Sequence, residues 1–442
     1  MGIKAYGSLL LLTALVVGAW LSLISGNANA VAQYEEHLAT ARLKAEQGVT
    51  SEVLTNYRAA LRMTPSIPVA SELLDYSQQH QDVDEYQTLL REIVTMFPAE
   101  PFAYERLTDS LIGEERYENA FEVFEAAGRN DVSSEHLRDT YAEIRYVHEV
   151  GSYAYDDART FLTGDIAAVY SRGAWQFMEG VGRVRGDRYE DAQSFYGNRA
   201  TVVVDGVPQF IDRNYDTVLI ATQSDYLSFG TLANGMFPAV KPNGQTVYLN
   251  TSFDVMFNGT EFDSGSSFAN GLAVVGHEGV LKVIDTGGVQ VGEDYQAVAS
   301  GDGGIIYSSE RYFAAVSDKF YLYDDEGSRV GTLEVDDARP FNNAGLAAVK
   351  VGETWGFTDT AGEIMIEPQF DEARSFANGL AAVRQGDLWG YVAPNGEMAI
   401  EFRFEDALDF SESGTTFIKR EDPTRVGSGP AWYFLQLIRS KV

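Results

Sequence analysis

The sequence predicts an α + β multidomain protein in which an N-terminal solenoid of α-helical hairpins precedes an all-β repeat domain, a seven- or eight-bladed β-propeller. Two observations predict this class. Residues 31–150 carry helical periodicity and two prolines, Pro65 and Pro98, that lie 33 residues apart. From residue 151 the apolar residues alternate, and glycine turns separate short strands. We therefore predict three segments: residues 1–30 for targeting, residues 31–150 as helical repeats and residues 151–442 as the propeller.

The first 30 residues have the features of an export signal. Lys4 is the only charged residue before residue 35, and it precedes a largely apolar run from Leu9 to Ile24. Ala28-Asn29-Ala30 then fits the A-x-A pattern of signal peptidase, with cleavage before Val31. An apolar stretch of this length can also span a bilayer, so residues 5–25 are alternatively an uncleaved anchor. Both alternatives predict an extracytoplasmic protein, either secreted or anchored to the outer face of a bacterial membrane.

The composition excludes several classes of function. The 442 residues include no cysteine, which excludes disulfides, thiolate metal sites and thiol catalysis. They include 33 basic and 65 acidic residues, which give a formal net charge of -32. Such a chain repels phosphate groups. We therefore expect no nucleic-acid partner, and contact with a membrane only through the N-terminal segment if it is uncleaved.

Start and stop signals divide residues 31–150 into three helical hairpins and a final helix. Gly48 follows the first helix, Asp82 suits an N-cap, and Pro101 suits the first turn of a helix. The expected helices cover residues 34–47 and 51–63, 69–79 and 83–97, and 101–112 and 117–127, followed by a capping stretch at 133–150. The capping stretch is expected to cover the last hairpin, as the end of a repeat stack requires.

These hairpins resemble the tetratricopeptide repeat family. The residues at its small, aromatic and proline positions are Ala41, Tyr57, Ala60 and Pro65 in the first hairpin, and Tyr104, Leu107, Ala120, Phe124 and Ala127 in the third. The second hairpin departs from the pattern, with Leu74 and Tyr86 where small residues are expected, which predicts a splayed helix pair. The resemblance implies a groove that holds a peptide or a partner helix; the alternative is a stalk that spaces the next domain.

Residues 151–442 repeat with a period near 35. The clearest copies begin at Phe341 and Phe376 and align almost residue for residue. Successive first strands are predicted around Val169, Val204, Val240, Val275, Val316, Val349, Val383 and Ile418. A sheet of three or four strands cannot bury both faces alone, so the units must stack radially or linearly. Closure removes exposed sheet edges, which favours a propeller whose C-terminal strands complete a blade that begins near Phe161.

The two clearest copies resemble the Trp-Gly (WG) repeat family. Trp355-Gly356 and Trp389-Gly390 carry its signature dipeptide, and Gly-Leu-Ala-Ala-Val precedes each of them. Elsewhere the dipeptide is eroded, and the corresponding pairs are Trp175-Gln176, Lys282-Val283 and Trp432-Tyr433. The resemblance covers the chain from Phe161 onward.

Structural roles account for the conspicuous residues of the β-domain. A tryptophan that recurs at one place of each repeat is typical of a core between blades, although Trp175, Trp355, Trp389 and Trp432 are alternatively platforms on which a sugar stacks. The glycine after the tryptophan indicates close approach of a neighbouring backbone rather than phosphate binding. Acidic clusters at Asp285 and Asp324 lack the ligand ladder of a calcium loop, and we predict hairpin turns there.

The sequence predicts no catalytic, cofactor or metal site. It contains no H-E-x-x-H or G-x-S-x-G motif, and four of its five histidines lie in the helical part. The expected function is a non-enzymatic protein-protein interaction scaffold of the cell envelope. The alternatives are a propeller that binds carbohydrate or peptidoglycan and, less favoured, a propeller glycosidase or lyase with paired carboxylates. The expected partners are proteins or cell-wall glycan.

Overall fold

The computed structural model describes residues 29–180, 182–220, 225–306, 308–342, 344–421 and 429–439. The chain divides into two compact units. The helical unit ends at Val147 and also takes in Ile438 and Arg439, whereas the propeller unit is His148–Leu437. This division lies three residues before the boundary that the sequence predicts.

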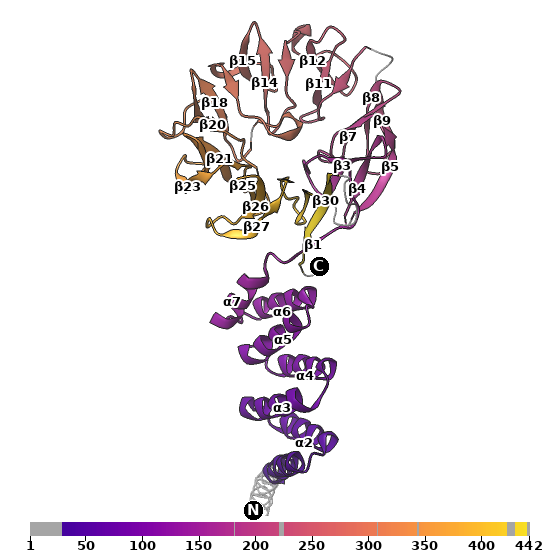
Figure 1. The fold of residues 1–442 in the computed structure, drawn as a ribbon, viewed down its shortest axis with the longest axis vertical. Coiled ribbons are helices and arrows are strands. Elements are labelled where there is room, and N and C mark those ends of the chain that lie inside the picture. Colours follow the sequence, from indigo (N-terminus) through magenta and orange to yellow (C-terminus); the bar gives the residue numbers. More distant parts are fainter. Residues whose placement is uncertain are drawn as a thin grey trace, which may run out of the picture. The chain divides into compact units, whose positions relative to one another are not determined.

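The helical unit is a stack of helices in which successive helices pack against each other (Figure 1). A first helix occupies residues 29–46. It is followed by α2 (Thr50–Met63), α3 (Ile67–His80), α4 (Val83–Met96), α5 (Pro101–Gly113), α6 (Tyr117–Arg129) and α7 (Glu135–Ile144). All six helices predicted for the three hairpins are present, and α7 is the predicted capping helix. Asp82 caps α4 by accepting a hydrogen bond from the Glu85 amide at 2.8 Å, and Pro101 begins α5.

One apolar core runs along the helical unit. Ala41, Ala60 and Ala120 are fully buried in it, so the helices approach closely at these small residues. Leu74 and Tyr86, which occupy small-residue positions of the repeat pattern, are buried in the same core. The second hairpin therefore packs its larger side chains between helices, and the predicted splay does not expose them.

Ion pairs join successive hairpins around this core. The pairs are Arg42–Glu72 (2.8 Å), Arg58–Glu92 (2.9 Å), Arg106–Asp75 (2.6 Å), Arg116–Asp84 (3.0 Å) and His136–Asp109 (2.8 Å). Their members lie 27 to 34 residues apart, which is close to one repeat period. Partly exposed pairs of this kind contribute little stability individually. Their main consequence is that basic side chains of the unit are engaged within it.

The described part of the propeller unit contains eight sheets, which are arranged in a ring and are called blades 1 to 8 in the following (Figure 1). Blades 1 to 4 consist of β2 (Asp157–Ala158), β3 (Ile166–Ser171), β4 (Ala174–Glu179) and β5 (Arg183–Tyr189); β6 (Asp191–Ala192), β7 (Ala200–Val204), β8 (Val207–Ile211) and β9 (Thr217–Ile220); β10 (Ser228–Phe229), β11 (Met236–Val240) and β12 (Thr246–Asn250); and β13 (Ser264–Gly265), β14 (Leu272–His277), β15 (Val280–Asp285) and β16 (Gln290–Tyr295).

Blades 5 to 8 consist of β17 (Ala297–Val298), β18 (Tyr312–Val316) and β19 (Lys319–Tyr323); β20 (Asp337–Ala338), β21 (Leu346–Val351), β22 (Thr354–Asp359) and β23 (Ile364–Phe370); β24 (Glu372–Ala373), β25 (Ala381–Gln385), β26 (Leu388–Val392) and β27 (Met398–Phe404); and β28 (Asp406–Ala407), β29 (Thr415–Glu421) and β30 (Pro430–Leu437) with β1 (His148–Val150). Short 3₁₀ turns occupy η1 (Phe257–Gly259) and η2 (Asp302–Gly304).

The ring is an eight-bladed β-propeller, which confirms the predicted fold class and resolves the blade number. The eight predicted first strands are present as β3, β7, β11, β14, β18, β21, β25 and β29. A two-residue strand precedes each of them and pairs with it. The sequence pattern does not reveal these short strands, because two residues are too few to show alternation.

Blade 8 joins both ends of the propeller unit. Its sheet has the order β1-β30-β29-β28, and Val150 of β1 pairs with Leu435 of β30. The prediction that the closing blade begins near Phe161 is therefore wrong, because the closing strand lies upstream of it. Three residues of strand give no periodic signal, but they cover the edge of β30 that would otherwise be open to pairing with another chain.

The predicted targeting segment lies outside the described residues. This applies to residues 5–25 and to Ala28, whereas Ala30 and Val31 belong to the helix at residues 29–46. Within the part of the chain that the structure describes, no helix is long and apolar enough to cross a membrane.

Candidate functional site

Four tryptophans occupy equivalent places in blades 1, 6, 7 and 8. Across the ladder, Trp175 pairs with Tyr170, Trp355 with Lys350, Trp389 with Arg384 and Trp432 with Lys419. In the same order, their exposed fractions are 8%, 2%, 8% and 7%. These side chains are part of the blade packing, and none presents an exposed ring face on which a sugar could stack.

An arginine covers the tryptophan of blades 1, 6 and 7 and reaches the next blade. The guanidinium carbons of Arg159, Arg339 and Arg374 lie 4.3, 4.9 and 5.7 Å from the ring centroids of Trp175, Trp355 and Trp389, respectively. The same arginines pair with acidic residues of the following blade, namely Asp191 (2.7 Å), Glu372 (2.7 Å) and Asp406 (3.8 Å). Each arginine therefore combines a cation-π contact within one blade with an ion pair to the next.

The glycine of the Trp-Gly dipeptide permits a close approach between strands. A Cβ built on Gly356 would lie 2.5 Å from the carbonyl oxygen of Ile366, and one on Gly390 would lie 2.6 Å from that of Ile400. Ile366 and Ile400 belong to the facing strands β23 and β27. The dipeptide glycine therefore serves backbone packing.

Blades 1 and 4 have a side chain at this position and a glycine in the facing strand instead. Gln176 stands there in blade 1, and Gly186, with φ +82°, lies in the bulge between β4 and β5. Lys282 stands there in blade 4, and Gly292, with φ +73°, lies in the corresponding bulge. The pairing of β14 with β15 places Leu281 at the tryptophan position and Lys282 at the glycine position of the repeat. The pair predicted from the sequence, Lys282-Val283, is therefore wrong by one residue.

Replacing Gly390 by alanine is expected to lower the free energy of unfolding of the propeller unit by about 1 to 3 kcal/mol, because the added methyl group overlaps the Ile400 carbonyl. Urea denaturation followed by tryptophan fluorescence measures this loss. Gly113→Ala serves as a control in the helical unit, because no atom lies within 4 Å of a Cβ at that position, and it should leave the unfolding of the propeller unit unchanged. Equal midpoints for Gly390→Ala and the wild type would contradict the close-approach explanation.

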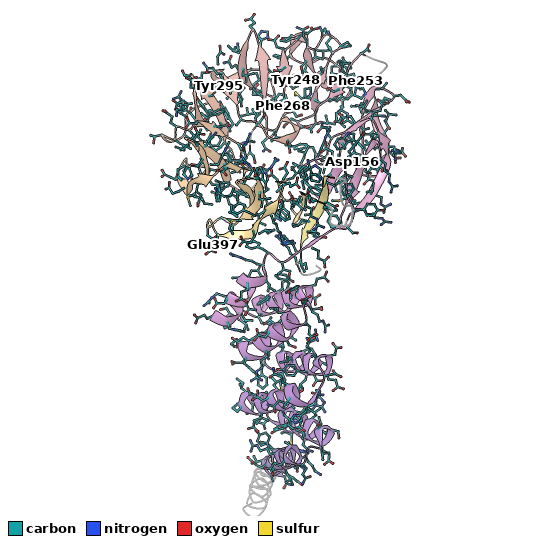
Figure 2. The ribbon with its side chains drawn as sticks, in the orientation of Figure 1. Asp156, Tyr248, Phe253, Phe268, Tyr295 and Glu397 are labelled. Carbon is teal, nitrogen blue, oxygen red and sulfur yellow. The ribbon has the colours of Figure 1, made fainter. Side chains whose placement is uncertain are left out.

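The two acidic clusters that resemble calcium loops are hairpin turns. Oδ1 of Asp285 accepts hydrogen bonds from the amides two and four residues later, at 2.9 and 2.8 Å. Oδ1 of Asp324 does the same at 3.0 and 2.8 Å. Asp156, labelled in Figure 2, accepts a hydrogen bond from the backbone amide of Arg172, which lies in the hairpin turn between β3 and β4. Among the described residues, no group of three or more His, Cys, Asp or Glu side chains is placed to hold a metal ion.

Tyrosine and phenylalanine side chains fill the cores of blades 3 to 5, which contain no tryptophan. Tyr248 lies edge-on to Phe268, with ring centroids 5.3 Å apart (Figure 2). Tyr295 and Tyr312 join their hydroxyl oxygens at 2.8 Å in a buried hydrogen bond. Because these hydroxyls find partners, the aromatic rings can be buried without an unsatisfied polar group.

The propeller unit encloses a cavity of about 770 Å³ with a charged lining. Its charged side chains are Asp302, Glu372, Glu405, Asp406, Asp409 and Glu412 together with Arg339, Arg374 and Arg384. Glu405 and Glu412 are exposed, so the cavity is open to solvent. A second cavity, of about 330 Å³, shares Thr160, Asp302 and Arg374 with the first.

Asp409 departs from the repeat pattern at the wall of this cavity. The equivalent residue, which lies two positions after the two-residue strand of a blade and precedes a phenylalanine, is Ser194 in blade 2 and Ser375 in blade 7. The two serine hydroxyls accept hydrogen bonds from strand amides of the preceding blade, at 3.1 and 3.0 Å. Asp409 instead accepts a hydrogen bond at its Oδ2 from the side-chain Nδ2 of Asn342 at 3.3 Å. Its Oδ1 is buried and has no hydrogen-bond partner in the described part of the chain.

Burial raises the pKa of Asp409 to about 6. The positive charges of Arg374 and Arg339 and the hydrogen bond from Asn342 lower the pKa, while the negative charge of Asp302 raises it further. The balance leaves a carboxylate that changes its charge in the range between pH 5 and 7. A titrating carboxyl group in a cavity is a feature of binding sites.

A loop of blade 5 brings Asp302 into the cavity. This loop contains η2, in which Asp302 is followed by Gly303 and Gly304. A Cβ built on Gly303 would lie 3.0 Å from Leu162 of blade 1, and one on Gly301 would lie 3.2 Å from Pro340 of blade 6. The loop therefore extends from blade 5 to the opposite side of the ring, and it places a second carboxylate close enough to influence Asp409.

Sequence reasoning did not identify this site. Trp389, one of the predicted repeat positions, lines this cavity, but Asp409, Asp302, Asn342, Thr160 and Arg374 were not singled out. The one available signal is that blade 8 has an aspartate at a position occupied by Thr160, Ser194 and Ser375 in blades 1, 2 and 7 and by Pro340 in blade 6. Against 65 acidic residues, a single such substitution does not stand out until the fold shows that it faces a cavity.

Comparison with known proteins identifies the repeats in part of the chain. The family model "WG containing repeat" matches residues 332–355, 355–389 and 389–422. No curated protein matches the chain. The matched segment includes both intact Trp-Gly dipeptides and runs from blade 6 into blade 8, so these blades contain WG repeats.

Several solved structures are similar to the chain at low identity. BamB from Moraxella catarrhalis is 12% identical, with 66% of this chain and 100% of that chain covered and a TM-score of 0.43. Hsv2 from Kluyveromyces lactis is 11% identical over 65% and 99% of the two chains, with a TM-score of 0.36. PorZ of Porphyromonas gingivalis, a surface component of the type-IX secretion system, is 9% identical over 62% and 42%, with a TM-score of 0.36. Similarities of this size say nothing about what the present protein binds.

Proposed function

We propose that the protein is a non-enzymatic interaction scaffold of a bacterial envelope, exported from the cytoplasm, with a tetratricopeptide-like helical unit that binds a basic protein partner. A propeller with WG repeats fits a protein-interaction module, because it presents a broad surface. The observation that supports the partner's chemistry is the charge balance of the helical unit, where residues 31–150 contain 10 basic and 23 acidic residues.

The basic residues of the helical unit are largely engaged within it. Six of the ten form ion pairs with acidic residues of the same unit: Arg42, Lys44, Arg58, Arg106, Arg116 and Arg129. The acidic residues outnumber the basic ones by 13, which is 23 minus 10. The surplus charge is therefore negative, and it favours association with a positively charged protein surface by electrostatic complementarity.

The proposed location rests on the N-terminal sequence. A single lysine, an apolar run and Ala28-Asn29-Ala30 form an export signal, with Val31 as the first residue of the mature chain. A chain without cysteine is compatible with an oxidising compartment. If cleavage does not occur, residues 5–25 anchor the protein to the outer face of the membrane.

The carbohydrate-binding alternative has lost its main support. It depends on exposed aromatic side chains, and the four tryptophans of the propeller unit are buried. Cell-wall binding through other residues is an outcome that the experiment below detects.

The decisive experiment uses the purified protein as bait with solubilised envelope and, separately, with cell-wall sacculi. We expect one defined basic protein to be retained at about 50 mM salt and released by about 0.5 M salt, because the Debye length shortens from more than 10 Å to about 4 Å. The retained protein is then purified and titrated into the bait, where saturable binding at a fixed stoichiometry is expected.

Two controls separate the alternatives. Charge reversal at Glu114 and Glu115, which are exposed and form no ion pair among the described residues, is expected to weaken partner binding, and the same reversal at the propeller residue Asp387 is expected to leave it unchanged. Salt-insensitive retention on sacculi without any protein partner would contradict the scaffold function and support a wall-binding module.

A further inference from the structure

The cavity of the propeller unit carries more negative than positive charge. Its lining contains six carboxylates and three guanidinium groups. The guanidinium groups are engaged with two of the carboxylates: Arg339 pairs with Glu372 at 2.7 Å, Arg374 with Asp406 at 3.8 Å, and Arg384 with Glu372 at 4.0 Å. Within the described residues, no ion pair involves Asp302, Glu405, Asp409 or Glu412, so the lining retains uncompensated negative charge.

The cavity wall also has polar atoms that lack hydrogen-bond partners. Thr160 is 6% exposed, and its hydroxyl has no partner in the described part of the chain. The same is true of Oδ1 of Asp409. Buried polar groups are normally paired, and unpaired ones in a cavity wall indicate a place for a ligand or for water. Both residues line the cavity, as do Arg374 and Asn378, whose Nε and Nδ2 donors also lack a partner in the described part of the chain.

Asp409 is not required by the architecture of the ring. Ser194 and Ser375 fill the equivalent position in other blades and tie neighbouring blades together through their hydroxyls. Asp409 makes no such bond among those found in the structure and accepts one long hydrogen bond from Asn342. A residue that departs from the repeat pattern without improving the packing is expected at a functional site.

The chemistry of the lining restricts the ligand. An anion is excluded by the surplus of carboxylates, because like charges at short distance cost several kcal/mol. A divalent metal ion does not fit, since no group of three or more suitable side chains in the described residues is arranged around one point. An organic ammonium group fits, because it carries one positive charge and three hydrogen-bond donors and no acceptor.

We propose that the cavity binds a primary ammonium group through Asp409, with Asp302 supplying a second negative charge and the hydroxyl of Thr160 a further acceptor. The group belongs either to a small amine or to a lysine side chain inserted by a protein partner. This assignment does not depend on the proposed scaffold function, because it rests on the propeller unit alone.

The ammonium group explains why a carboxylate is placed in a partly dehydrated position. Burial of a charged group is unfavourable unless an opposite charge accompanies it. A bound cation provides that charge, and it is expected to lower the pKa of Asp409 from its raised value. The charged groups that act on Asp409 are Arg374, Arg339 and Asp302, and both arginines are already engaged with acidic residues of the next blade. The loop that carries Asp302 adjoins the same cavity.

The test measures binding of 1,4-diaminobutane to the full chain by calorimetry and by tryptophan fluorescence, because Trp389 lines the cavity. We expect saturable binding at pH 7.5 and affinity about tenfold lower at pH 5, where Asp409 is mostly protonated. The neutral 1,4-butanediol and the anion glutarate are expected not to bind. N-acetyl-Gly-Lys-Gly amide, whose only ammonium group is that of the lysine side chain, serves as the second arm, because tighter binding of the peptide than of the diamine identifies a lysine side chain as the natural source.

Three variants make the result decisive. Asp409→Asn removes the charge at constant shape and is expected to weaken diamine binding at least tenfold, and Asp302→Asn is expected to weaken it by a smaller factor. Asp409→Ser introduces the residue found at this position in blades 2 and 7. It keeps the test possible if Asp409→Asn does not fold. Asp387→Asn, an exposed turn residue, is the control and should bind normally. Absence of binding by both amines, or equal binding by the wild type and Asp409→Ser, would overturn the proposal.

Discussion

Replacing Trp355 by alanine is expected to lower the free energy of unfolding of the propeller unit by about 3 to 5 kcal/mol. The side chain is 2% exposed and packs in a cluster with Phe357, Ile366 and Phe370. Its removal leaves a cavity and also takes away the ring beneath Arg339, whose guanidinium carbon lies 4.9 Å from the ring centroid. Urea denaturation monitored by circular dichroism in the β-sheet region measures the change.

Two variants separate packing from other effects. Trp355→Phe keeps an aromatic ring and is expected to lose less than half as much stability. Tyr153→Ala removes a large side chain that is 61% exposed, so it is expected to change stability by no more than about 0.5 kcal/mol. If Trp355→Ala were as stable as the wild type, the tryptophan would not be part of the core, and a ligand-binding role for it would have to be reconsidered.

Replacing Asp409 by serine is expected to stabilise the propeller unit at pH 8 and to have little effect at pH 4. Burial raises the pKa of this carboxyl from 3.8 to about 6. In the folded state the group therefore holds its proton at pH values where the unfolded chain has released it, so its contribution to stability is present below pH 4 and is lost as the pH rises through 6. A shift of this size corresponds to about 3 kcal/mol.

The measurement compares the free energy of unfolding of the wild type and of Asp409→Ser at pH 4, 5, 6, 7 and 8. The difference between the two proteins isolates this group from all others that titrate in the same range. Asp387→Ser, at an exposed turn, is the control and should follow the wild type at every pH. A constant difference between the wild type and Asp409→Ser across this range would show that the carboxyl group is not perturbed in the folded state.

The fold was largely predictable because its signals are local and repeated. The helices of the hairpins follow from a periodicity of 3.6 and from caps such as Asp82, and the strands at the eight predicted positions follow from alternation and glycine turns. Repetition adds information, since a pattern that is weak in blade 4 is clear in blades 6 and 7. The one-residue error at Lys282 arose where the dipeptide is lost and its glycine moves to the facing strand.

The candidate site was not predictable, because it depends on residues that are distant in the sequence. Asp409 meets Asn342 across 67 positions, and Asp302 reaches the same cavity on a loop of blade 5. No local period relates these residues. The arginines that cover the tryptophans of blades 1, 6 and 7 were missed for the same reason, since their acidic partners belong to the next blade.

The sequence by itself determined the two kinds of repeat and the number of predicted first strands, because periodicity is a property of short segments. It also determined the net negative charge, because the charge is a sum over the residues of the chain. Only the tertiary structure decided how the ring closes and which carboxylate faces the cavity. Closure uses the three residues of β1 paired to β30, a contact made through space between the two ends of the propeller unit. The role of Asp409 follows from its burial and from its neighbours, and burial exists only once the blades have assembled.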